Sequence, residues 1–220
     1  AYFDKEKGIG YNFCRLTINS CDFSTEMYSY DPSPADDELT DFSIERDKED
    51  VIPMVLAAKE KASDLSLFAS PWSPPAWMKT NGKMDKGGFL RKECQDAWAR
   101  YTAHYIKAYE EEGIPIWGVT VQNEAKAEQG WESCHYEAGE ERDFVTGYLK
   151  PVYEREGLGD KKIFFWDHNK ERVVDRSLET LCSDRARAAF DGIAVHWYSG
   201  DHFGALDVTH RLFPEKLLIA

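Results

Sequence analysis

Short apolar runs alternate with amphipathic stretches along the whole chain, and this alternation constrains the fold more than any other feature. Each run is rich in β-branched or aromatic residues and is bounded by polar or turn residues, which is typical of strands buried on both faces. Buried strands separated by helices predict an α/β fold with a parallel sheet. The six runs are Tyr11–Ile18, Leu65–Ala69, Ile116–Val121, Lys162–Trp166, Gly192–Tyr198 and Lys216–Ala220.

The stretches between the runs have helical spacing. From Asp96 to Glu111, aromatic residues recur at steps of three and four, which places them on one helical face. Ser43 is a candidate cap for a helix that runs through Val51–Ala62, with Pro53 near its start. Further helices are expected at 140–154, interrupted by Pro151, and at 171–181 and 203–213, and the end of another at Ala1–Lys7.

Six strands are too few to close a (β/α)8 barrel, which needs eight. The last run, Lys216–Ala220, is followed by no loop or helix, and a buried strand without a neighbour leaves an unpaired edge. We therefore interpret residues 1–220 as part of a TIM-barrel catalytic domain that holds about strands two to seven. A six-stranded open sheet is the alternative. No GxGxxG or GxxxxGK motif follows any run, which argues against a nucleotide-binding fold.

Composition excludes several classes of partner. The net charge of -13 repels phosphate backbones and anionic lipid, so we expect no nucleic-acid partner. No apolar run is long enough to cross a bilayer, so no obligate membrane insertion is expected. Aromatic residues make up 14% of the chain, including 7 Trp, and indole faces pack well on sugar rings, although most Trp side chains lie in protein cores. The five cysteines show no CxxC or zinc spacing and are interpreted as mostly free thiols.

Polar and aromatic side chains stand at the ends of nearly all the runs. In a parallel barrel these ends converge on one face, where the chemistry is performed. The sequence has no cluster of metal ligands at a known spacing and no GxSxG motif, and Cys134 has no evident base. We therefore expect no metal or organic cofactor, and carboxylate chemistry on a neutral polar substrate. The candidates are Arg15, Asp22, Trp72, Asn123, Glu124, Asp167, His168, His196, Trp197 and Tyr198.

Glu124 is the leading catalytic candidate because of its position at the end of the third run. Glycoside cleavage uses two carboxyl groups, one as proton donor and one as nucleophile or base. We expect partial burial among aromatic side chains to keep the Glu124 carboxyl protonated near neutral pH. Asn123 beside it is suited to donate to a sugar hydroxyl. The alternative is a surface glutamate paired with Lys126.

Five segments resemble glycoside hydrolase family 30, and glucosylceramidases and β-1,6-glucanases in particular. They are NFCRLTINSCDFS, LFASPWSPPAWMKTNG, WGVTVQNEAKAEQGWESC, GIAVHWY and THRLFP. The resemblance implies a barrel with an attached β-sandwich and hydrolysis of β-glucosides or β-glucans with retention of configuration. It implies an acid/base at Glu124 and a nucleophilic glutamate beyond Ala220. The chain alone is therefore expected to be inactive and to need the C-terminal remainder of its barrel.

The resemblance also implies roles for the other candidates. Arg15 corresponds to an arginine that hydrogen-bonds the nucleophile, with an ion pair to Asp22 as the alternative. Asp22 and Trp72 correspond to residues that bind sugar hydroxyls, and Trp77 is as well explained by core packing. His196 and Tyr198 are expected to line the site, and Trp197 to form a wall of it. Trp131 is expected to form an outer subsite. Asp167 and His168 are expected to support Glu124.

One position departs from the family pattern, because Ala125 stands where the family commonly has proline after the acid/base. Proline would stiffen this turn, so its absence is expected to loosen the loop and shift substrate preference. Three alternatives stay open: a β-xylosidase or β-fucosidase on the same scaffold, a non-catalytic carbohydrate-binding relative, and a metal-dependent hydrolase. The charge and the free cysteines favour a bacterial cytoplasmic or secreted protein.

Overall fold

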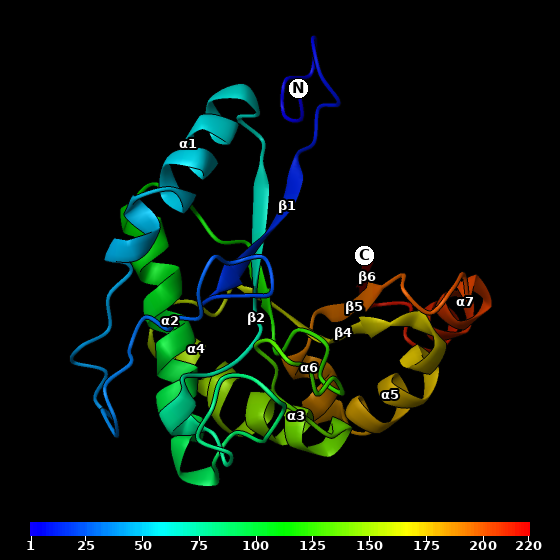
Figure 1. The fold of residues 1–220 in the computed structure, drawn as a ribbon. Coiled ribbons are helices and arrows are strands. Elements are labelled where there is room, and N and C mark those ends of the chain that lie inside the picture. The colour runs from blue at the N-terminus through cyan, green and yellow to red at the C-terminus, as the bar shows by residue number, and fades with distance from the viewer.

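The computed structural model describes residues 1–220, and its centre is a single sheet of six parallel strands (Figure 1). The strands follow one another in chain order across the sheet, so each neighbouring pair is joined by a crossover connection. All six predicted strands are confirmed. They are β1 (Phe13–Ile18), β2 (Ser66–Pro71), β3 (Gly118–Thr120), β4 (Lys162–Asn169), β5 (Gly192–His196) and β6 (Leu217–Ile219).

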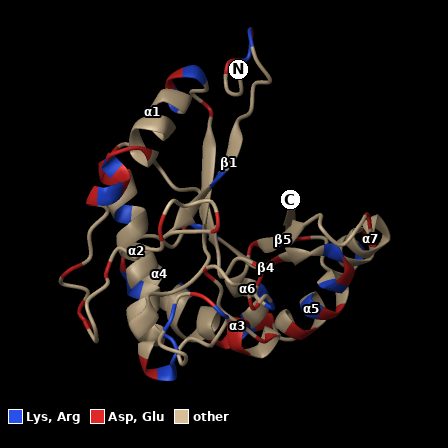
Figure 2. Ribbon diagram, viewed as in Figure 1, with Lys and Arg blue, Asp and Glu red and all other residues tan.

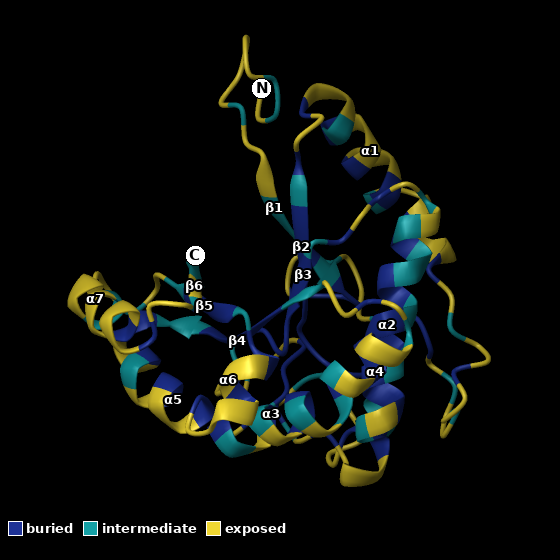
Figure 3. Cartoon of the chain, turned by 180° about the vertical axis from the view of Figure 1, so that it is seen from behind, coloured by how far each residue is buried: buried dark blue, intermediate teal, exposed yellow.

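The helices arch round the outer, convex side of the sheet (Figure 1). Their outward faces are exposed while the strands β2 to β5 are mostly buried (Figure 3). Charged residues of both signs lie on these outer helices and on the loops (Figure 2). No helix is both long and apolar enough to cross a membrane. The α-helices are α1 (Val51–Lys61), α2 (Gln95–Glu111), α3 (Ala138–Phe144), α4 (Lys150–Arg155), α5 (Val173–Thr180), α6 (Asp184–Ala189) and α7 (Phe203–Leu212).

Three helix predictions need correction. Residues 1–7 form turns instead of a helix, because the Asp4 side chain accepts hydrogen bonds from the backbone of Glu6 and Lys7. The stretch 140–154 is α3, a π-helical turn at Val145–Leu149 and α4, so Pro151 begins a helix without ending one. The short helix α6 was not predicted, although Ser183 caps it by accepting from the Ala186 N–H.

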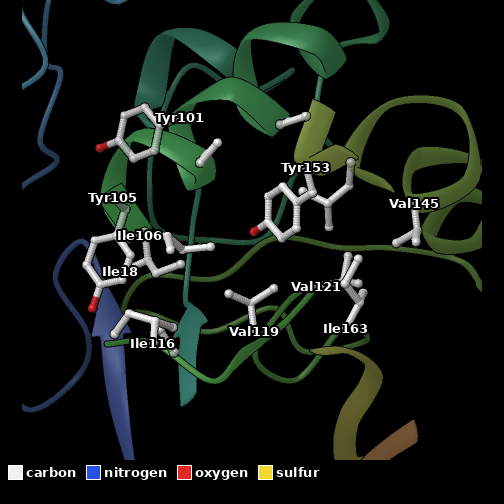
Figure 4. Packing of buried hydrophobic residues seen from close by; sticks show 14 of the residues in the cluster. Ile18, Tyr101, Tyr105, Ile106, Ile116, Val119, Val121, Val145, Tyr153 and Ile163 are labelled. Carbon is white, nitrogen blue, oxygen red and sulfur yellow. The ribbon is translucent and has the colours of Figure 1, made fainter. Parts of the chain in front are cut away.

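The core lies between the sheet and the helices. The predicted aromatic face of α2 is confirmed, since Trp98, Tyr101, Tyr105 and Tyr109 are fully buried. These side chains belong to one buried cluster with the outward-facing residues of the strands and with α4, and Figure 4 shows Tyr101 and Tyr105 in it. Because successive strand residues point to opposite faces, the remaining positions face the concave side, where aromatic rings cluster at one end and polar groups gather at the other. In the aromatic cluster Phe13 stacks on Phe68 and meets Trp117 edge to face, and Trp117 in turn contacts Phe164.

Candidate active site

A cavity of about 360 Å³ lies at the carboxyl ends of the strands, on the concave side of the sheet. Most of the predicted site residues line it, so side chains far apart in sequence are brought together here. The lining residues are Arg15, Thr17, Cys21, Asp22, Phe23, Trp72, Asn123, Glu124, Trp131, His196 and Tyr198. A larger hollow of about 880 Å³ lies elsewhere, beside α3 and loop residues 80–95, away from the strand ends where barrels keep their chemistry.

Asp167 is the centre of the polar network beneath the cavity. Its buried carboxylate accepts hydrogen bonds from Arg15 Nη2 at 2.5 Å, Thr120 Oγ1 at 2.7 Å and His196 Nε2 at 2.9 Å. Burial by itself would raise the pKa of Asp167, but Arg15 and His196 hold that pKa below its usual value. Asp167 therefore stays ionised and keeps two cationic groups in place.

The backbone around Glu124 is held by both neighbouring strands. The Asn123 N–H donates to the Pro71 carbonyl oxygen at 2.8 Å, and the Glu124 N–H donates to the Asp167 carbonyl oxygen at 2.8 Å. Glu124 has φ of 49°, a left-handed conformation that is uncommon for a residue with a side chain. Asp167 is also left-handed, at 44°, where β4 shifts register against β5. Such strain persists only where surrounding contacts fix it, and it concentrates at functional sites.

His196 joins Glu124 to Asp167. Its Nδ1 lies 3.1 Å from Glu124 Oε1, and its Nε2 faces Asp167. Burial opposes a charge on the imidazole, but the hydrogen bonds to Asp167 and Glu124 raise the pKa of His196 to about 9. The ring is therefore protonated at neutral pH and donates to both carboxylates.

The pKa of Glu124 is shifted in the opposite direction from the one expected. Its side chain is 16% exposed, so it is partly buried as expected. However, the hydrogen bond from His196 lowers the pKa of Glu124 more than burial raises it. The expectation rested on burial alone and overlooked the neighbouring cation.

Arg15 points into the network and does not pair with Asp22. Its Nε donates to Ser70 Oγ at 2.8 Å and its Nη2 to Asn123 Oδ1 at 3.0 Å, besides the ion pair with Asp167. Asp22 instead accepts the indole N–H of Trp72 at 3.0 Å. The guanidinium lies 4.6 Å from the centre of the Trp72 ring, which is a cation–π contact. The alternative ion pair between Arg15 and Asp22 was therefore wrong.

The remaining candidates lie around this centre. Trp131 and Tyr198 are at the rim of the cavity and are 40% and 65% exposed. Trp197 lies outside the lining, 72% exposed and stacked on Tyr198. His168 makes no hydrogen bond to Glu124, and its buried Nδ1 has no partner. Glu124 does not pair with Lys126, whose ammonium contacts Glu137 at 2.5 Å.

Sequence reasoning missed the supporting hydroxyl groups. The Thr120 hydroxyl donates to Asp167 and accepts from the Ser70 hydroxyl, whose oxygen lies 2.6 Å away, so two strand residues hold the floor of the site. Side chains alternate between the two faces of a strand, and counting back in steps of two from the polar strand ends would have identified these hydroxyl groups. Thr17, Cys21 and Phe23 at the cavity lining were also missed. Nowhere in the structure do three or more His, Cys, Asp or Glu side chains gather as they would around a metal ion.

Comparisons with known proteins agree with this arrangement. Residues 1–220 match the glycosyl hydrolase family 30 TIM-barrel domain. The lysosomal acid glucosylceramidase of Mus musculus is 35% identical over 234 residues, which cover 100% of this chain and 45% of that protein. This chain thus spans a little under half the length of that relative.

Two solved structures have the same fold. SrfJ from Salmonella typhimurium superposes with a TM-score of 0.95 and 38% identity, over 99% of this chain and 48% of that one. The endo-β1,6-glucanase BT3312 superposes with a TM-score of 0.89 and 28% identity, over 98% of this chain and 50% of that one. Together with the family match, these superpositions show that the six-stranded sheet is part of a TIM barrel.

Proposed function

We propose that this chain, which belongs to glycosyl hydrolase family 30, carries the general acid/base of a retaining β-glycosidase, and that Glu124 is that residue. The observation that supports the proposal most strongly is the setting of its carboxylate. Oε1 is bonded to His196, while Oε2 makes no hydrogen bond within the protein and belongs to a residue that lines the cavity. One oxygen is thus fixed and the other is available to a substrate.

The proposed mechanism needs a second carboxyl group about 5–5.5 Å from Glu124, the separation used by retaining enzymes. Family resemblance assigns it to a glutamate beyond Ala220, in the remainder of the barrel. In the first step this glutamate attacks the anomeric carbon while Glu124 protonates the departing oxygen. In the second step Glu124 removes a proton from the water that hydrolyses the glycosyl-enzyme.

The lowered pKa of Glu124 fits this two-part site. A second carboxylate within about 5 Å opposes ionisation and raises the pKa of its neighbour. Completing the barrel would therefore convert Glu124 from the ionised form of this chain into a proton donor. Formation of the glycosyl-enzyme would leave Glu124 in its basic form, because its proton departs with the leaving group and the attacking carboxylate, now a neutral ester, no longer raises the pKa of Glu124.

For the substrate we propose a β-linked glucoside or β-1,6-glucan. The mouse relative is named a glucosylceramidase and the solved structure BT3312 an endo-β1,6-glucanase. Asp22 and Trp72 form one wall of the cavity and would contact the sugar that occupies it. Trp131 and Tyr198 at the rim would contact the group on the other side of the scissile bond. A β-xyloside or β-fucoside substrate is the alternative that a screen of nitrophenyl glycosides would reveal.

The acid/base role is tested by Glu124→Gln in the complete polypeptide that contains this chain. We expect kcat/KM on glycosides with poor leaving groups to fall by about 10²–10⁴, the usual contribution of a general acid. Dinitrophenyl glycosides need no protonation, so their cleavage should persist and azide should accelerate their turnover. The matched control is Glu128→Gln, an exposed glutamate in the same loop. Wild-type kcat/KM for Glu124→Gln on the poor leaving group would refute the assignment, and binding without turnover by the wild type would favour a non-catalytic module.

A further inference from the structure

Helices α3 and α5 hold a buried ion pair that no step of the proposed mechanism uses. Glu141 Oε2 lies 2.7 Å from Arg176 Nη2, and the side chains are 0% and 6% exposed. Desolvating two charges costs about as much as their attraction returns, so such a pair contributes little net stability. Its significance lies in the further contacts that each partner makes.

Glu141 reaches the irregular part of β4. Its Oε1 accepts the backbone N–H of Trp166 at 3.1 Å, at the point where β4 shifts register against β5. Trp166 itself is left-handed, with φ of 73°, and its indole lies under the Arg176 guanidinium at 5.1 Å. The next residue, Asp167, is the one whose carbonyl oxygen accepts the Glu124 N–H.

Arg176 reaches the loop that follows Glu124. The same Nη2 atom that contacts Glu141 donates to the Tyr136 carbonyl oxygen at 3.0 Å. The Tyr136 N–H in turn donates to the Ala125 carbonyl oxygen at 2.7 Å. The ion pair is therefore connected to the Glu124 N–H through β4 and to the carbonyl group of the next residue, Ala125, through the loop.

We propose that the Glu141–Arg176 pair is a positioning device that holds the backbone of Glu124 in its left-handed conformation and so aims its carboxylate into the cavity. The inference rests on the acid/base role proposed for Glu124. It also accounts for a turn built with Ala125, since buried contacts on either side supply the rigidity that a proline would otherwise give. Neither residue of the pair lines the cavity, so their role is to position and not to react.

The test uses the complete polypeptide and removes the contacts without leaving a buried charge. The double variant Glu141→Leu/Arg176→Met replaces the pair by apolar side chains of similar size, a change that proteins often tolerate. The double variant Glu141→Gln/Arg176→Met is also neutral but keeps an oxygen that can accept the Trp166 N–H. Arg176→Lys keeps the charge with a single donor group. Asp143→Asn is the control, because Asp143 is an exposed carboxylate on the same helix.

The readout is kcat/KM on two aryl β-glucosides, one with a dinitrophenyl leaving group and one with a methoxyphenyl leaving group. For Glu141→Leu/Arg176→Met we expect about a 10- to 100-fold loss on the methoxyphenyl substrate, the effect of a misplaced general acid. The dinitrophenyl substrate should change less than about threefold, because its departure needs no proton. Glu141→Gln/Arg176→Met should recover part of the loss, Arg176→Lys should show a smaller selective loss, and Asp143→Asn should show none.

The outcomes separate the two proposals. Equal losses of kcat/KM on both substrates mean general damage to the fold and overturn the positioning role. Unchanged kcat/KM in Glu141→Leu/Arg176→Met also overturns it. If that variant does not fold, Arg176→Lys decides, and the positioning role fails unless its loss is confined to the methoxyphenyl substrate. If Glu124→Gln itself keeps full activity on that substrate, the acid/base proposal fails first.

Discussion

The Asp167→Asn substitution should uncouple His196 from the network, and its effect follows from the contacts. The buried Asp167 carboxylate accepts hydrogen bonds from Arg15, Thr120 and His196. Asparagine keeps the shape and one oxygen but removes the charge. An opposite charge at hydrogen-bond distance changes a pKa by about 1–3 units, so we expect the pKa of His196 to fall by that amount from its value of about 9.

Because the folded pKa of His196 is raised, this residue stabilises the folded state at low pH and ceases to do so at high pH. The folded pKa of His196 is about 9, above its ordinary value of 6.5, so protonated His196 stabilises the folded state by about 3 kcal/mol below pH 6.5. That stabilisation disappears as the pH rises through 9. Between pH 7 and pH 8.5 the wild type should lose about 2 kcal/mol from this group, and the Asn variant about 1 kcal/mol or less.

Among the histidines, this interval isolates His196, and Lys79, which also titrates in it, contributes equally to both proteins. Burial lowers the pKa of His104 and of His168, so their contributions are complete by about pH 7. The assay is NMR titration of the His196 ring together with urea unfolding at pH 7 and pH 8.5. An unchanged His196 titration in Asp167→Asn, or an equal loss of stability in both proteins, would refute the electrostatic account.

Three further predictions concern the scaffold. Tyr109→Phe removes a hydroxyl that donates to Asp47 Oδ2 at 2.5 Å, and urea unfolding should show a loss of about 1–2 kcal/mol. Gly192→Ala would place a Cβ 2.3 Å from the Leu217 carbonyl oxygen, so thermal unfolding should show at least about 1–3 kcal/mol of destabilisation, whereas an unchanged Tm would contradict the close approach. Burial lowers the pKa of Lys79 from 10.5 to about 8. The free energy of unfolding of the wild type should therefore gain about 3 kcal/mol from this group between pH 8 and pH 10.5. Lys79→Met should lack that gain when both proteins are unfolded with urea at the two pH values.

The strands could be predicted because burial on both faces leaves a continuous apolar run, and the aromatic face of α2 because helical spacing is regular over seventeen residues. The helix predicted at residues 1–7 was wrong because the Asp4 side chain accepts hydrogen bonds from backbone N–H groups and so favours turns. The helix α6 was missed because its six residues are too few to show a period.

Within the site, the sequence identified the reactive residue types but could not say how they pair. Position at a strand end was enough to bring Glu124, Arg15 and His196 to one cavity. It could not distinguish Asp22 from Asp167 as the partner of Arg15, since both lie shortly after an apolar run. The partner of Arg15 depends on the left-handed backbone and the register shift at the end of β4, and the pattern of side chains in the sequence does not predict either feature.

The sequence by itself determined the order of strands and helices and the face on which polar groups meet, because periodicity and strand direction are local properties of the chain. Only the tertiary structure decided the charge state of Glu124 and the contacts of the Glu141–Arg176 pair. Those properties arise from distances between side chains many residues apart, and electrostatic energies inside a protein change steeply with such distances and with burial.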